Sequence, residues 1–221
     1  MAGLTIVTAA TANPVSLTEF RDYARIDDNV DTSLIFAIIG AATRFCEEYT
    51  NRSFVTQTLR LSLDGIGEYD QQIQDGFYTG PFQTFYKNFI EIPKPPLISV
   101  SSIKFFDDSD TESTWATSNY YIDNVSEPAR VILRDGGAYP TDLRNANGIQ
   151  VNYTAGYGAA SAVPEAIRVA IMQYGLNLYE HRGDTEKNST QAPALVQNLL
   201  APFVIRRYGV SSFQPRYSAM R

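Results

Sequence analysis

Two amphipathic helices separated by a short acidic turn, over residues 16–51, constrain the fold more than any other feature of this sequence. Ser16 and Glu19 have the spacing of a capping box, which predicts a first helix from Leu17 to about Arg25. Asp31 is placed to cap a longer second helix. The apolar positions of that second helix are Leu34, Ile35, Ile38, Ile39, Ala42, Phe45, Cys46 and Tyr49. Because two such helices cannot bury both apolar faces against each other alone, further helices are expected.

From residue 54 the hydrophobic period changes from about four to two, which predicts strands. Residues 55–63 alternate as a strand with one buried face does. Further strands are predicted at 89–92, 98–106, 120–122, 129–133 and 149–153. Residues 64–88 show little periodicity and are predicted to form a long loop. Five or six short strands at this spacing predict a small antiparallel sandwich or barrel.

After residue 158 the period becomes helical again. Pro164 starts a predicted helix that ends at Gly183, and a second proline-started helix ends or kinks at Pro202. These helices can cover the opening pair, so the predicted fold class is α+β, with a four-helix core, an inserted antiparallel β-sandwich or barrel module and an extended C-terminal tail. The predicted divisions are an N-terminal arm and helical hairpin (1–53), an inserted β domain (54–160), C-terminal helices (161–202) and the tail (203–221).

The only histidine and the only cysteine do not suggest catalysis. His181 is predicted near a helix C-terminus, where it can interact with the last carbonyls. Cys46 lies on an apolar helix face beside Glu47 and Glu48, which favours a small buried hydrophobe over a reactive thiolate. We therefore expect no catalytic residue, no metal site and no cofactor. Paired carboxylates for glycoside hydrolysis remain open, because such pairs meet only in space.

Three other motifs each have a functional and a structural interpretation. The acidic cluster Asp107 to Glu112 lacks the glycine and terminal glutamate of a calcium loop, which favours a solvated hairpin tip. The Gly156-Tyr157-Gly158 motif lacks the remaining residues of a nucleotide loop, which favours a turn from sheet to helix. Trp115 and the tyrosines could line a carbohydrate groove, although aromatic residues more often fill a small β core.

The charge is unevenly distributed along the chain. The net charge is −6, but residues 203–221 contain four arginines and no acidic residue, which leaves fourteen basic and twenty-four acidic residues, a net of −10, for the rest. An acidic body with a basic, aromatic tail favours docking of the tail on a protein groove over nucleic-acid binding. Residues 1–15 lack the features of a signal peptide, and the longest apolar run is too short to span a bilayer, so neither secretion nor a membrane partner is expected.

The order of six short segments resembles the head–tail connector (adaptor) proteins of tailed bacteriophages and gene transfer agents, in particular the longer members with a β insertion. The segments are Leu17-Thr18-Glu19-Phe20 with Ala24-Arg25-Ile26-Asp27, Leu34-Ile35 with Ala41-Ala42 and residues 47–52, residues 95–100 with Ile103, residues 151–158, residues 163–167, and residues 178–183.

The resemblance implies a homo-oligomeric ring, usually of twelve subunits, at the head–tail junction of a virion, with assembly in the host cytoplasm. Its expected partners are the portal protein, a stopper or tail-completion protein, and double-stranded DNA that passes through the lumen without specific binding. No enzyme activity is implied. The expected portal-binding residues of the tail are Arg206, Arg207, Tyr208, Phe213, Arg216 and Tyr217. The alternatives are a carbohydrate- or protein-binding β module of a phage tail or baseplate component, and a hydrolase whose acids converge only in the fold.

Overall fold

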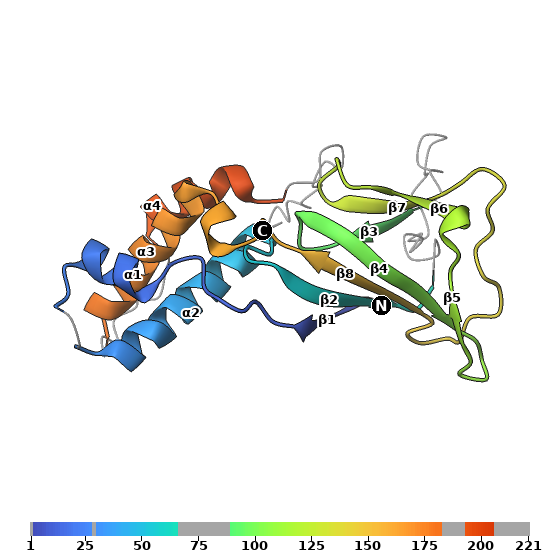
Figure 1. Ribbon diagram of the computed structural model, residues 1–221, viewed down its shortest axis with the longest axis horizontal. Helices are drawn as coiled ribbons and strands as arrows, with labels where there is room; N and C mark the ends of the chain where they lie inside the picture. Colours follow the sequence, from blue (N-terminus) through green and yellow to red (C-terminus); the bar gives the residue numbers. More distant parts are fainter. Residues whose placement is uncertain (1, 28–29, 66–88, 183–192, 206–221) are drawn as a thin grey trace, which may run out of the picture.

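The computed structural model describes residues 2–27, 30–65, 89–182 and 193–205. Helices gather at one end of an elongated molecule and strands form the other end (Figure 1). The predicted α+β class and the antiparallel strand pairing are confirmed. The portal-binding residues predicted in the tail lie outside the described residues, as do residues 66–88 of the predicted long loop.

The helices begin and end close to the predicted positions. The described α-helices are α1 (Leu17–Ala24), α2 (Thr32–Thr50), α3 (Glu165–Glu180) and α4 (Ala194–Leu200), and the 3₁₀ turn η4 (Ala201–Phe203) follows α4. The capping box is formed: the Ser16 N–H donates to Glu19 Oε2 at 2.8 Å, and the Glu19 N–H donates to Ser16 Oγ at 3.2 Å. Pro164 and Pro193 occupy the residue before α3 and α4, because their fixed φ suits a helix start.

Asp31 does not cap α2 as predicted. It occupies the N-cap position, but its φ of 49° places it in the left-handed region and its side chain makes no capping hydrogen bond. The Asp31 carboxylate instead accepts a hydrogen bond from the Tyr179 hydroxyl at 3.0 Å and pairs with Arg182 at 3.4 Å. Asp31 therefore ties the start of α2 to the end of α3.

All four helices contribute to one buried apolar cluster. Its helical members with no exposed surface are Phe20 of α1, Ile35, Ala42 and Cys46 of α2, Ile167, Ala170 and Ile171 of α3, and Val196 and Leu200 of α4. The helices approach closely at Gly175 of α3, where a Cβ atom would lie 2.7 Å from the ring of Phe20. Of the predicted apolar face of α2, Leu34 and Tyr49 remain 40% and 38% exposed.

The strands form two antiparallel sheets. The strands are β1 (Ala2–Thr8), β2 (Gln57–Leu63), β3 (Phe89–Ile92), β4 (Leu97–Phe106), β5 (Glu112–Thr114), β6 (Tyr120–Asp123), β7 (Ala129–Leu133) and β8 (Ile149–Ala155). One sheet has the order β1-β2-β8-β4-β5 and the other β3-β7-β6. Leu59 and Val151 of the first share an apolar cluster with Ile90 and Val131 of the second. The sheets thus pack as two layers, and the described strands close no barrel, contrary to that part of the prediction.

Strand β1 is not predicted by the sequence pattern. It pairs with β2 so that Leu4 lies opposite Leu61 and Ile6 opposite Leu59, and the register shifts between Ile6 and Thr8. The first residues of the N-terminal arm therefore belong to the large sheet. Because the paired residues of β2 lie fifty or more positions away, no local periodicity indicates the pairing.

The Gly156-Tyr157-Gly158 motif forms the predicted turn between sheet and helix. Gly156 and Gly158 have φ values of 130° and 124°, and a Cβ atom on Gly156 would lie 2.7 Å from the Val55 backbone. The Tyr157 N–H donates to the Phe54 carbonyl at 2.8 Å. Only glycine tolerates this approach, because it has no Cβ atom. The motif thus lets the end of β8 pack against the segment that joins α2 to β2.

Candidate functional site

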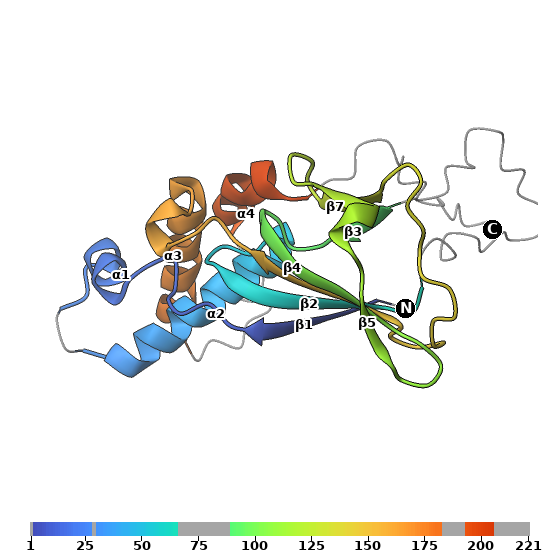
Figure 2. The ribbon, with the colours of Figure 1, turned by 45° about the vertical axis from the view of Figure 1, so that its right-hand side comes forward.

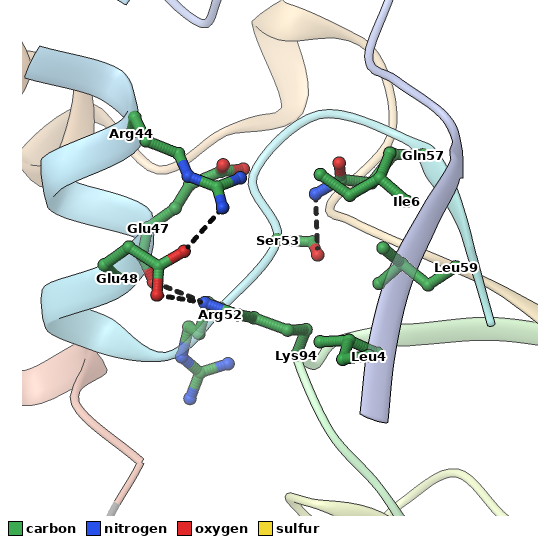
Figure 3. A pocket seen from close by; sticks show the side chains of 10 residues that line it. All are labelled: Leu4, Ile6, Arg44, Glu47, Glu48, Arg52, Ser53, Gln57, Leu59 and Lys94. Carbon is green, nitrogen blue, oxygen red and sulfur yellow. Dashed lines mark hydrogen bonds and ion pairs between the residues drawn. The ribbon is translucent and has the colours of Figure 1, made fainter. Parts of the chain in front are cut away.

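A groove lies where the helices meet the large sheet (Figure 3). It has a volume of about 210 Å³. Its lining comprises Leu4 and Ile6 of β1, Gln57 and Leu59 of β2, Arg44, Glu47 and Glu48 of α2, and Arg52, Ser53 and Lys94 from the connecting segments. The groove thus has apolar and charged lining residues.

Among the charged groups of the groove, Glu48 pairs with two cations. The Glu48 carboxylate contacts Arg44 at 3.0 Å and Lys94 at 3.3 Å. Glu47 Oε1 accepts a hydrogen bond from the Phe54 N–H at 2.9 Å. Burial raises the pKa of Glu47, and that hydrogen bond partly opposes the increase. A raised carboxyl pKa also occurs in catalytic acids, but this carboxylate is engaged in joining α2 to the segment that leads into β2.

Arg52 connects distant parts of the chain at this junction. Its side chain is buried, Nε donates to the Phe203 carbonyl at 2.6 Å, and its guanidinium pairs with Glu127. Close by, the Ile205 N–H donates to the Thr50 carbonyl at 3.2 Å. These bonds fix the segment after α4 against the end of α2 and the β6–β7 loop.

The β6–β7 loop is held in one shape by Asp123. Its carboxylate accepts hydrogen bonds from the Val125 N–H at 3.1 Å, the Ser126 N–H at 3.2 Å and the Ser126 hydroxyl at 2.7 Å, and it pairs with Arg130. The hydrogen bond from Arg130 contributes most to holding the pKa of Asp123 well below its usual range. The hydrogen bonds from Ser126 make the next largest contribution. The loop leaves Val125 90% exposed.

His181 and Cys46 have the structural roles predicted for them. His181 is the residue after α3, and its Nδ1 lies 2.9 Å from the Asn177 carbonyl. Cys46 is fully buried, and burial raises its thiol pKa to about 12. Neither residue lines the groove, so they do not form a catalytic pair there.

The acidic cluster forms the tip of the β4–β5 hairpin, as predicted. Asp107 Oδ1 accepts the N–H groups of Ser109 and Thr111 at 2.9 and 2.8 Å. Asp110 pairs with Arg144, and Glu112 with Lys104. Within the described ranges, no group of three or more His, Cys, Asp or Glu side chains could hold a metal ion.

Trp115 lies inside the β core. It is 5% exposed, its Nε1 donates to the Ala138 carbonyl at 3.2 Å, and its ring stacks on Tyr120 with the centroids 4.9 Å apart. Of the two interpretations of the aromatic residues, the structure supports core packing at Trp115. This side chain presents no open face on which a sugar could stack.

Sequence reasoning missed Arg52 because its partners are far away in the chain. Glu127 and Phe203 lie 75 and 151 residues further on. An arginine directly after a helix carries no local signal of such contacts. The groove was missed for the same reason, since β1 supplies part of its lining.

The fold closely matches chains from gene transfer agent (GTA) particles. A chain from the neck of an empty GTA particle, computed with C6 symmetry, aligns with a TM-score of 0.73 and 20% identity, over 94% of this chain and 98% of that chain. A chain from a native GTA virion gives a TM-score of 0.70 at 20% identity, and one from a native GTA neck computed with C12 symmetry gives 0.68 at 21%, with the same coverage. At these identities the comparison establishes a shared fold.

The sequence comparisons add no family. No family model matches the sequence, and no curated protein matches it significantly. Among the helices that the structure describes, none is both long and apolar enough to cross a bilayer.

Proposed function

We propose that this chain is a structural neck protein of a phage-like particle, a head–tail connector (adaptor) that forms a ring beneath the portal and continues the DNA channel toward the tail. The observation that carries the proposal is the match to GTA neck chains, which spans 94% of this chain and 98% of the other. The C6 and C12 symmetries of the matched neck structures support a ring, with twelve subunits as the expected number.

The tail is the proposed portal-binding segment. Its root is fixed at the junction, because Arg52 binds the Phe203 carbonyl and the Ile205 N–H bonds to Thr50. Arginine and tyrosine, which the tail carries, are frequent at binding hot spots. A stopper or tail-completion protein is the proposed partner on the opposite side of the ring.

The charge of the body suits a channel. Outside residues 203–221 the net charge is −10. Like charge keeps the DNA backbone from adhering to a protein surface, so DNA passes without specific binding. The proposed role is structural and not enzymatic, and the engaged carboxylates of the groove are consistent with that role.

Native mass spectrometry of the purified chain, alone and mixed with the portal protein of the same particle, tests this proposal. We expect a ring of about twelve copies on the portal. A chain whose mass is the same with and without the portal would overturn the proposal.

A truncation tests the role of the tail. Deleting residues 209–221 should leave the thermal unfolding midpoint unchanged and abolish binding to the portal. The double variant Lys104→Ala/Arg144→Ala is the control, since it removes two positive charges near the hairpin tip, far from the tail root. Normal portal binding by the truncated chain would refute the role of the tail.

The alternative, a carbohydrate-binding β module, receives no support from the site on which it depended. Trp115 is buried between the rings of Phe105 and Tyr120. We therefore do not propose it.

A further inference from the structure

Strand β1 is an unprotected edge of the large sheet. It pairs with β2 on one side only among the described strands. Its seven residues include no charge and no proline, and Leu4, Ile6 and Val7 are 41%, 41% and 49% exposed. Natural sheets protect their edges with charges, prolines or very short strands. An edge without such protection is expected where another chain covers it.

The opposite edge of the same sheet is shorter and carries a charge. Strand β5 has three residues, and it begins with the charged Glu112, which pairs with Lys104. The two ends of one sheet are therefore unequal: β5 is protected against strand addition and β1 is open to it.

The smaller sheet has a second edge at β6, which is short and only partly open. Tyr121 and Ile122 are 45% and 38% exposed there, the charge of the strand, Asp123, pairs with Arg130, and the Tyr120 carbonyl accepts a hydrogen bond from Arg134 Nε at 2.8 Å. Figure 1 shows β6 and β1 on opposite sides of the β part, and Figure 2 shows the smaller sheet again on the side away from β1. A ring needs two unlike contact surfaces on each subunit, because a surface that contacts its own copy produces a closed dimer.

We propose that β1 of one copy pairs with β6 of the next copy around the ring, so that the sheets of neighbouring subunits join edge to edge. This inference rests on the proposed function. Main-chain hydrogen bonds would join the strands, and the exposed side chains of Tyr121 and Ile122 would cover those of β1.

The size of this contact sets its strength. Strand β6 offers four residues, whereas a stable interface between two proteins uses about 20–30 residues on each side. A single contact of this kind is weak between two free copies and becomes strong when a closed ring holds all of them at once. The edge pairing therefore favours assembly on the portal over assembly in free solution.

Cysteine cross-linking tests the pairing, because the native thiol does not interfere. Cys46 is fully buried with a pKa of about 12, so an engineered surface cysteine is the reactive one. The variants are Thr5→Cys on β1, Tyr121→Cys on β6 and both together, treated with a short bismaleimide in particles purified from producing cells. The control is Thr5→Cys combined with Thr114→Cys on the protected edge β5.

In particles, the Thr5→Cys/Tyr121→Cys variant should give a ladder of covalent multimers, and neither single variant nor the control should do so. Dimers from Thr5→Cys alone would overturn the proposal, since they would show β1 pairing with β1. If the double variant is present in the particles at the wild-type copy number but gives no ladder of covalent multimers, the edge pairing is overturned and the proposed function is left intact.

Absence of the wild-type chain from the particles would overturn the proposed function instead. In that case the double variant is cross-linked as purified protein at up to about 1 mM, where even contacts of very weak affinity are populated. A ladder of multimers from the purified protein would support the edge pairing. The absence of such a ladder would overturn the edge pairing.

Discussion

Truncating Arg52 to alanine should destabilise the junction between the helices and the large sheet. The variant loses the hydrogen bond from Nε to the Phe203 carbonyl and the ion pair with Glu127. The Phe203 carbonyl loses the donor that satisfied it, whereas the Glu127 side chain, 43% exposed, regains water. The two losses therefore differ in cost.

The expected magnitude follows from this difference. Breaking a fully buried ion pair costs about 3–5 kcal/mol, and the exposure of Glu127 reduces that cost. A hydrogen bond to a charged group contributes about 1.5–3 kcal/mol. We expect a loss of about 2–3 kcal/mol in the free energy of unfolding, which for 221 residues corresponds to a decrease of about 5–10 °C in Tm.

Thermal and urea unfolding of the full chain measures this loss. Glu127→Ala should cost about 1 kcal/mol, and the double variant should show a coupling energy of about 1 kcal/mol between Arg52 and Glu127. Arg44→Ala is the matched control: it removes an arginine from an ion pair with Glu48 whose side chains are 59% and 54% exposed, so it should cost less than about 0.5 kcal/mol. A loss at Arg52→Ala no larger than at Arg44→Ala would refute the reasoning.

Three further predictions concern single side chains. Gly175→Ala gains about 1 kcal/mol of helix propensity but forces a methyl group against the fully buried Phe20, so calorimetry should show a net loss of about 1–2 kcal/mol. Ser16→Ala should cost about 1 kcal/mol at pH 7 by urea unfolding. The hydrogen bond from the Ser16 backbone N–H lowers the pKa of Glu19, so the stability advantage of the wild type over Glu19→Gln should shrink as the pH falls below 4.5, and a constant difference would contradict this account. Burial raises the pKa of Glu47, so the contribution of Glu47 to stability should decline as the pH rises above 4.5, and the stability of the wild type relative to Glu47→Gln should decline over the same titration.

Elements with local signals could be predicted from the sequence. The capping box located the start of α1, and period-two alternation located β2, with every second residue from Gln57 to Leu61 buried. Pro164 and Pro193 located the starts of α3 and α4. In each case the physical cause, a cap, an alternating face or a fixed φ, acts within a few residues of the element.

Features that depend on distant partners could not be predicted. Strand β1 forms by pairing with β2, and Arg52 binds Glu127 and Phe203. These partners are distant in the chain, so the sequence around β1 and Arg52 does not indicate the contacts. Asp31 has the right residue type for a cap, but tertiary contacts with Tyr179 and Arg182 take its side chain elsewhere. The predicted portal-binding residues of the tail lie outside the described residues and remain a prediction.

The order of the elements also determines when the subunit can fold. The helices α1 and α2 lie between β1 and β2 in the chain, and seven of the described strands lie between α2 and α3, so each half of the molecule interrupts the other. Phe20 cannot meet Gly175 until α3 has been synthesised, and the apolar faces of α1 and α2 wait for α3 and α4 throughout synthesis of the sheets. The subunit therefore completes its helical core only after α4 leaves the ribosome. A nascent chain that ends before α4 lacks a complete helical core and cannot enter the proposed ring as a folded subunit.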